Sequence, residues 1–282
     1  MNAKDLNWAL IDVEHDEQLA VDPRTSEWSL AGAPLPAGVS VRLRTLRGGL
    51  RDGVRVLTVD VGSLKATILP DRGMGLHRVH AGELTLGWQS PVKGPVHPAF
   101  VPVGESSGIG WLWGFDEFLV RCGLESNGAP EFDDHGRVKY PLHGRIANLP
   151  ARKLSVGFDG ETKEIVVRGE VDEARPLLRK LRLRTEYRFR AGSPTLKLRD
   201  EIVNLSAVAA EAQLLYHINF GPPLGAPGSK LLMPVAKLAP RDAHAGKDIP
   251  TWDQYPAAQA GFVDSSAKLR IGSMCRRRRN SL

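Results

Sequence analysis

The chain has 282 residues, of which 42% are hydrophobic and 25% charged, as in an average soluble globular protein. This composition excludes a disordered, collagen-like or coiled-coil chain. Its 29 glycines and 20 prolines exceed the average share and indicate many turns between short elements, which is typical of β structure. The formal net charge is +6, but the run Arg276 to Arg279 supplies four of these charges, so the remaining residues are nearly neutral. We therefore expect neither a nucleic-acid partner nor a membrane partner.

Two cysteines, Cys122 and Cys275, occur without a CxxC motif or a Cys/His ligand spacing. This pattern predicts no disulfide framework and no metal site, and no motif indicates a cofactor. No signal-peptide core and no run of 18 apolar residues occurs. We therefore expect a cytoplasmic protein with Cys122 as a buried structural residue.

Residues 1–38 form an acidic, Pro/Gly-containing stretch that we interpret as an irregular leader. Alternation of apolar and polar residues begins at Val39, and Gly62-Ser63 between two such runs predicts a β-hairpin. The second run stops at Pro70, which cannot donate to a strand ladder. The strands expected in this part are 39–46, 54–61 and 64–69.

Residues 85–150 are rich in Gly, Pro, Trp and Phe and lack periodicity, so we expect long functional loops over a sheet face. Strict alternation then returns, with Arg, Lys and Glu on one side and apolar residues on the other. This pattern predicts an antiparallel sheet with one solvated face. The strands expected here are 153–158, 164–171, 181–190, 195–203 and, with an ambiguous alanine-rich start, 207–217.

The pattern degrades after Gly261. We interpret residues 39–263 as one domain that is incomplete at its C-terminal end, and residues 264–282 as an atypical basic tail. The tail is either a disordered extension or the product of a shifted reading frame. Its arginine run could bind phosphates, but it stands without aromatic or base-reading motifs and is better interpreted as solvated.

Two histidines stand where a side chain can point into a binding site. His143 precedes a glycine in a loop, and His217 ends an apolar run. Imidazole can donate or accept a proton near neutral pH. The alternative is that each is a buried histidine hydrogen-bonded to the backbone.

Five segments in a fixed order resemble the aldose 1-epimerase (galactose mutarotase) superfamily, in its divergent uncharacterised branch. The resemblance covers roughly residues 40–262 and implies an all-β fold, a large antiparallel β-sandwich of the galactose mutarotase-like supersandwich type. It also implies a site for a monosaccharide or sugar derivative and interconversion of sugar anomers without a cofactor. The five segments are Pro70–Met74, Gly82–Pro91, Gly110–Leu124, Leu142–Arg145 and Tyr216–Phe220.

The resemblance implies roles for individual residues. His217 matches the general acid, and His143 matches the histidine that helps to hold the ring oxygen. Arg72 resembles an arginine that donates to sugar hydroxyls, which suits its five fixed N–H donors. Asp71 is expected to orient Arg72 or to shape the turn. The remaining residues that we expect to bind the substrate are Arg145, Asn219 and Trp113.

Trp113 belongs to an aromatic group with Trp111 and Phe115 in a Gly-flanked loop. Aromatic faces can stack on sugar C–H surfaces, and an indole N–H can bond a hydroxyl. The alternative, equally weighted, is that this group fills the end of the sandwich as core.

The resemblance also implies a general-base glutamate in a Gly-Leu-Glu-Pro-like setting, and no such segment follows Gly261. The general-acid and general-base contributions are each worth about 10²- to 10⁴-fold in rate. An enzyme of aldose 1-epimerase type therefore remains open beside a carbohydrate-binding protein without turnover.

A third hypothesis, a serine hydrolase, rests on Gly104–Gly108, which matches GxSxG with Ser106 as the nucleophile. That motif requires a strand before it and a helix after it. The following residues, Ile109 to Gly114, are a poor helix start.

Overall fold

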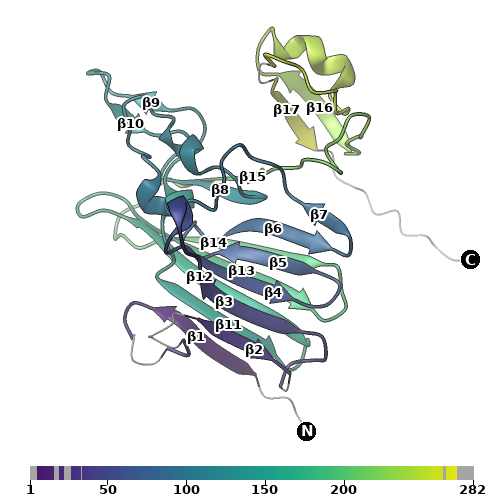
Figure 1. The fold of residues 1–282 in the computed structure, drawn as a ribbon. Helices are drawn as coiled ribbons and strands as arrows, with labels where there is room; N and C mark the ends of the chain where they lie inside the picture. Colours follow the sequence, from purple (N-terminus) through teal and green to yellow (C-terminus); the bar gives the residue numbers. More distant parts are fainter. Residues whose placement is uncertain (1–4, 16–18, 22–26, 33, 263–264, 272–282) are drawn as a thin grey trace, which may run out of the picture. The chain divides into compact units, whose positions relative to one another are not determined.

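The computed structural model describes residues 5–15, 19–21, 27–32, 34–262 and 265–271 (Figure 1). The chain forms two compact units, of which the first ends at Phe220 and the second begins at Gly221. The sequence predicted one domain over residues 39–263, between a leader (1–38) and a tail (264–282). Unit 1 contains both histidines and is described first.

One layer of unit 1 is a five-stranded antiparallel sheet. Apolar and polar residues alternate along its strands. In β13 (Lys180–Arg190), Leu181, Leu183 and Phe189 are buried, whereas the intervening arginines and glutamate are partly or fully exposed. In spatial order the strands are β1 (Leu6–Asp12), β11 (Lys153–Asp159), β12 (Glu164–Ala174), β13 (Lys180–Arg190) and β14 (Leu196–Asn204).

The other layer is an eight-stranded antiparallel sheet. The expected hairpin at Gly62-Ser63 is present, because β4 and β5 pair in antiparallel register on either side of it. In spatial order the strands are β15 (Gln213–Ile218), β8 (Leu119–Leu124), β6 (Gly75–Ala81), β5 (Lys65–Leu69), β4 (Arg55–Asp60), β3 (Ser40–Thr45) and β2 (Trp28–Ala31), with β7 (Leu84–Leu86) pairing to β6.

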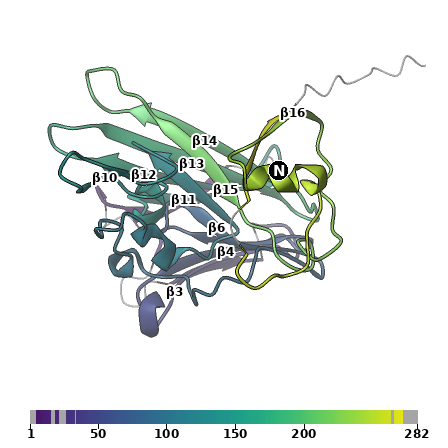
Figure 2. The ribbon, with the colours of Figure 1, turned by 90° about the horizontal axis from the view of Figure 1, so that it is seen from above.

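The two sheets lie face to face and share one hydrophobic core (Figure 2). Leu57 and Ile68 of one sheet belong to the same buried cluster as Leu183 and Phe189 of the other. Burial of apolar surface between the layers is the main stabilising contribution of such a sandwich. The fold class expected from the sequence, an all-β antiparallel sandwich, is confirmed.

A buried ion pair also connects the layers. Arg121 on β8 donates to both carboxylate oxygens of Asp200 on β14, at 2.6 and 3.0 Å. The Tyr216 hydroxyl on β15 donates to the same carboxylate at 2.9 Å. Both ionic side chains are at most 1% exposed. One carboxylate that is shielded from water therefore connects β8, β14 and β15.

The connections contain short 3-10 helices and a small hairpin. The described residues of unit 2 form a two-stranded antiparallel sheet and a 3-10 helix. No helix among the described residues is long and apolar enough to span a membrane. In unit 1 these elements are η2 (Gly49–Arg51), η3 (Pro98–Phe100), η4 (Gly110–Gly114), η5 (Ile146–Asn148), β9 (Glu131–Phe132) and β10 (Val138–Tyr140), and in unit 2 they are β16 (Val235–Pro240), η6 (Ala245–Thr251) and β17 (Ala267–Ile271).

Three expectations about the elements differ from the structure. The expected irregular leader contributes β1 and β2, because short partly buried runs such as Leu6–Asp12 complete the edge of a sheet despite their acidic surroundings. The expected loop region 85–150 contains β8, whose six residues are all buried and therefore show no alternation. The last expected strand begins only at Gln213, after an irregular alanine-rich stretch.

The expected basic tail is only partly described. Residues 267–271 form β17, which pairs with β16, whereas the arginine run at 276–279 lies outside the described residues.

Candidate functional site

The candidate site lies on the face of the eight-stranded sheet that points away from the core. On β15, Leu214 packs against the core and Tyr216 reaches Asp200, so the alternate residue His217 lies on the opposite face. On that face Trp111 packs with Val120 and Cys122 of β8 in a separate buried cluster. The connection between β7 and β8, which carries Trp111, thus covers this face as the sequence predicted.

His143 and His217 come together there, although they are 74 positions apart in the chain. Their ring centroids are 5.5 Å apart. The Trp111 ring lies 4.7 Å from His143 and 6.2 Å from His217, and Phe115 lies 5.1 Å from His217. The two imidazoles therefore share an aromatic surface formed by Trp111 and Phe115, whose own centroids are 4.5 Å apart.

His143 occupies an unusual backbone position. Its φ of 57° lies in the left-handed region, which non-glycine residues seldom adopt. The conformation is fixed because its N–H donates to Gly128 and its carbonyl accepts from Gly123. Loss of solvent, together with the neighbouring His217, lowers the pKa of His143 to about 4. At neutral pH His143 is therefore an uncharged imidazole.

Arg72 is 1% exposed and contacts η4 and η5. Its Nε donates to Glu117 Oε1 at 2.9 Å, one terminal nitrogen donates to the Asn148 side chain, and the other donates to the Gly114 carbonyl at 2.7 Å. The sequence predicted that Arg72 donates to sugar hydroxyls, but these donors are directed to protein groups. We therefore place Arg72 as an internal anchor of the site.

Of the two expectations for Asp71, the position in a turn is met, whereas the orientation of Arg72 is not. The Asp71 carboxylate accepts from the backbone N–H of Arg55 at 2.6 Å and from its guanidinium. Glu117 holds Arg72 instead: both side chains are fully buried and 2.8 Å apart. Glu117 lies within a segment that carried the family resemblance, but the adjacent acidic residues Asp116 and Glu117 gave no sign of which one would pair with Arg72.

Four buried side-chain atoms around this site have no hydrogen-bond partner. Trp111 Nε1 and Asn148 Nδ2 are donors, Asp116 Oδ1 is an acceptor, and His143 Nδ1 can be either. Each unpaired buried polar group costs about 1–3 kcal/mol. Such atoms are satisfied by ordered water or by a ligand, and a polyhydroxylated ligand supplies donors and acceptors together.

The other expected substrate-binding residues are more dispersed. Trp113 is 61% exposed on η4, whereas its neighbour Trp111 is buried beside the histidines. The Asn219 side chain donates to the Glu117 carbonyl at 2.9 Å. Arg145 is half-buried and lowers the pKa of Glu173, although burial raises that pKa overall.

Ser106 does not have the surroundings of a nucleophile elbow. It is exposed in a turn, with no strand directly before it and the short 3-10 helix η4 after it. The serine hydrolase hypothesis therefore lacks its structural context.

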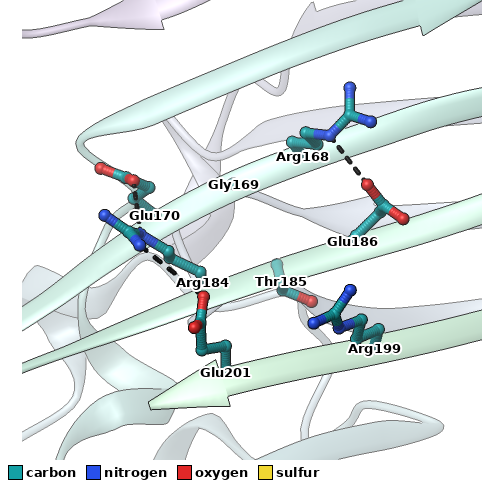
Figure 3. Close-up of a pocket in the computed structure, with 8 residues that line it drawn as sticks. All are labelled: Arg168, Gly169, Glu170, Arg184, Thr185, Glu186, Arg199 and Glu201. Carbon is teal, nitrogen blue, oxygen red and sulfur yellow. Dashed lines mark hydrogen bonds and ion pairs between the residues drawn. The ribbon is translucent and has the colours of Figure 1, made fainter. Parts of the chain in front are cut away.

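A depression on the outer face of β12, β13 and β14 carries alternating charges (Figure 3). Arg168 pairs with Glu186 at 2.8 Å, and Arg184 pairs with Glu170 at 3.1 Å. The formal charges of the three arginines and three glutamates around the depression cancel, so the depression offers little attraction to a charged ligand. They are Arg168, Arg184, Arg199, Glu170, Glu186 and Glu201.

The oxygens and nitrogen of Asp12, Glu14 and His15 lie close enough together to hold a metal ion. Protein cations already occupy this surface, because Arg152 and Lys153 both bond Glu14 and lower its pKa to about 2. Such an exposed acidic group is common on protein surfaces without a metal.

Cys122 is fully buried on β8, and burial raises the pKa of its thiol to about 12. It is therefore an unreactive structural cysteine at neutral pH, as expected. Cys275 lies outside the described residues.

The fold is a mutarotase-like β-sandwich. A crystal structure of a protein from Klebsiella pneumoniae subsp. pneumoniae, assigned provisionally as an aldose 1-epimerase, matches with a TM-score of 0.82 and 32% identity over 90% of this chain. A galactose mutarotase-like protein from Clostridium acetobutylicum matches with a TM-score of 0.48 and 14% identity over 73% of this chain. The chain spans 65% and 62% of these two proteins' lengths. The resemblance to aldose 1-epimerase-like proteins that the sequence indicated is borne out by the likeness to the Klebsiella structure.

A family model described as a domain of unknown function (DUF4432) matches residues 51–274. The chain belongs to this family. No curated protein matches it.

Proposed function

We propose that the protein binds a monosaccharide or a close sugar derivative over the outer face of β8 and β15 and interconverts its anomers. The convergence of His143 and His217 on the Trp111–Phe115 surface carries this proposal. Aromatic faces suit the C–H surface of a sugar ring, and the four unpartnered polar atoms suit its hydroxyls. The likeness to the Klebsiella protein supports the reaction class.

The two histidines have different parts in the chemistry. A general acid must protonate the ring oxygen while a base removes the proton of the anomeric hydroxyl; the bond from the anomeric carbon to the ring oxygen then breaks and an aldehyde forms. Rotation of the aldehyde and ring closure give the other anomer, with both protons returned. His217 is our candidate for the acid. Because its pKa is about 4, His143 is neutral and suited to a hydrogen bond to the sugar.

A second candidate function is carbohydrate binding without turnover. Two buried carboxylates, Glu117 and Asp200, are engaged with the protein's own arginines, Arg72 and Arg121. A carboxylate in such an ion pair is a poor proton acceptor. If the base in the reaction must be a carboxylate, this observation favours binding over catalysis.

One assay distinguishes the two functions. Freshly dissolved α-galactose and α-glucose are followed by polarimetry with the wild type and with the variants His217→Gln and His135→Gln. We expect His217→Gln to lose about 10²- to 10⁴-fold in rate. His135 lies exposed at a loop tip and serves as the matched control.

Equilibration by the wild type no faster than in buffer would contradict turnover. Saturation-transfer NMR then decides whether the protein binds the sugars at all. No transfer to either sugar would contradict both functions.

A further inference from the structure

Among the buried carboxylates of the described residues, Asp116 has an exceptional environment. Asp71, Glu117, Glu164 and Asp200 each pair with an arginine or a lysine. Glu173 accepts from the backbone N–H of Leu124 at 2.7 Å. The ionic partner of Asp116 is instead a histidine, and one of its oxygens has no partner.

The surroundings of Asp116 hold its carboxylate in one orientation. Oδ2 lies 3.1 Å from Nε2 of His77, which projects from β6. The backbone of Gly94 lies directly against the same oxygen, because a Cβ placed there would come within 2.3 Å of it. The Asp116 N–H donates to Glu117 at 3.1 Å, which connects it to the anchor of Arg72. These contacts fix Oδ2 and leave Oδ1 to accept another hydrogen bond.

The position of Asp116 connects it to the candidate site. It follows Phe115, whose ring contacts both Trp111 and His217. Its side chain is 3% exposed. Because Oδ1 is shielded from bulk solvent, its partner must be a group that enters the site, such as a ligand hydroxyl or a single water molecule.

We propose that Asp116 is a specificity-determining residue, whose Oδ1 accepts a hydrogen bond from a hydroxyl of the bound sugar, and that the site therefore selects neutral aldoses over uronic acids. The inference rests on the proposed function and names the substrate class for it. A carboxylate is only an acceptor, so it pairs with a hydroxyl but repels a second carboxylate. At a poorly solvated position this repulsion is weakly screened.

His77 is a positioning residue in this account. Its Nε2–H donates to Oδ2 and holds the carboxylate in place, with Oδ1 left unpaired. Loss of the donor weakens the binding of the neutral sugar but leaves the negative charge, and hence the discrimination, in place. A variant that keeps an N–H donor retains most of the affinity.

The test compares galactose with galacturonate, which differ only in the oxidation state of one carbon. Dissociation constants are measured by calorimetry or NMR titration at constant ionic strength. We expect the wild type to bind galactose at least tenfold more tightly. Asp116→Asn, which keeps the size of the side chain, is expected to reduce that ratio below threefold, whereas the exposed loop variant Asp134→Asn leaves it unchanged.

Two further variants separate orientation from charge. His77→Leu is expected to weaken galactose binding several-fold with the ratio retained, and His77→Gln is expected to restore most of the affinity. If Asp116→Asn does not fold, Gly94→Ala tests the placement of the carboxylate instead, because its methyl group displaces Oδ2 and the negative charge is kept. We expect Gly94→Ala to weaken galactose binding while galacturonate remains excluded.

The outcomes are distinct. Equal wild-type affinity for the two sugars, or an unchanged ratio in Asp116→Asn, would overturn the role of Asp116 and leave the proposed function intact. No binding of either sugar by the wild type would refute the proposed function and this inference together. A fall in thermal stability of Asp116→Asn with no change in the ratio would assign Asp116 a purely structural role.

Discussion

Replacing Asp200 by asparagine removes the negative charge on which two sheets and three strands converge. In the wild type Arg121 binds both carboxylate oxygens, and the Tyr216 hydroxyl binds one of them. The substitution keeps the size of the side chain but leaves the Arg121 charge, which is fully buried, without compensation. Because β15 carries His217, the loss also loosens the strand that positions the candidate acid.

The magnitude follows from burial. Breaking a buried ion pair by removing one partner costs about 3–5 kcal/mol. That is a large share of a typical free energy of unfolding of about 5–15 kcal/mol. For a unit of about 200 residues, 1 kcal/mol corresponds to about 2–4 °C in Tm, so we expect Tm to fall by roughly 6 to 20 °C.

The assay is thermal and urea unfolding followed by circular dichroism, with Glu201→Gln as the control. Glu201 is the next residue on β14, but it lies on the solvent face, where it is 55% exposed and 3.7 Å from Arg184. Such surface pairs contribute about 0–1 kcal/mol. If Asp200→Asn loses no more stability than Glu201→Gln, the buried pair does not hold the layers together.

Two further predictions concern titratable groups. In a Cys275→Ser variant, Cys122, with its pKa raised to about 12, should react with thiol reagents at pH 7 only after unfolding; labelling of this native variant at the rate of a free thiol would contradict this. His143 has its pKa lowered from 6.5 to about 4, so between these values the unfolded chain takes up a proton that the native protein does not. The contribution of the uncharged His143 to the free energy of unfolding is therefore complete above pH 6.5 and is lost as the pH falls toward 4. Urea unfolding of the wild type and of His143→Gln should show a smaller loss over this range in the variant, and parallel curves would refute the assignment.

The sandwich was predictable because its hairpins alternate strictly. Leu181, Leu183 and Phe189 face the core while the arginines between them face solvent, and this pattern is visible in one dimension. β8 was not predictable in the same way. All six of its residues are buried, and one of them is the ionic Arg121, which an alternation rule assigns to the surface.

The site was predictable only in part. The family resemblance identified His143 and His217, and the structure brings their rings together. The partners of Arg72 were not predictable, because Glu117 and Asn148 lie 45 and 76 positions away in sequence. The spacing of Trp111 and Trp113 likewise could not show that only the first would be buried, since both lie on one short 3-10 helix.

In the proposed complex the sugar lies against Trp111, and the tryptophan indole resonances test this placement most directly. Trp111 Nε1 is a buried donor without a partner beside both histidines, whereas Trp113 is 61% exposed. In a ¹⁵N-edited titration with galactose, with assignments from Trp111→Phe and Trp113→Phe, we expect the Trp111 indole signal to shift in a saturable manner. A saturable shift of the Trp113 signal with Trp111 unchanged, or no shift of either, would contradict it.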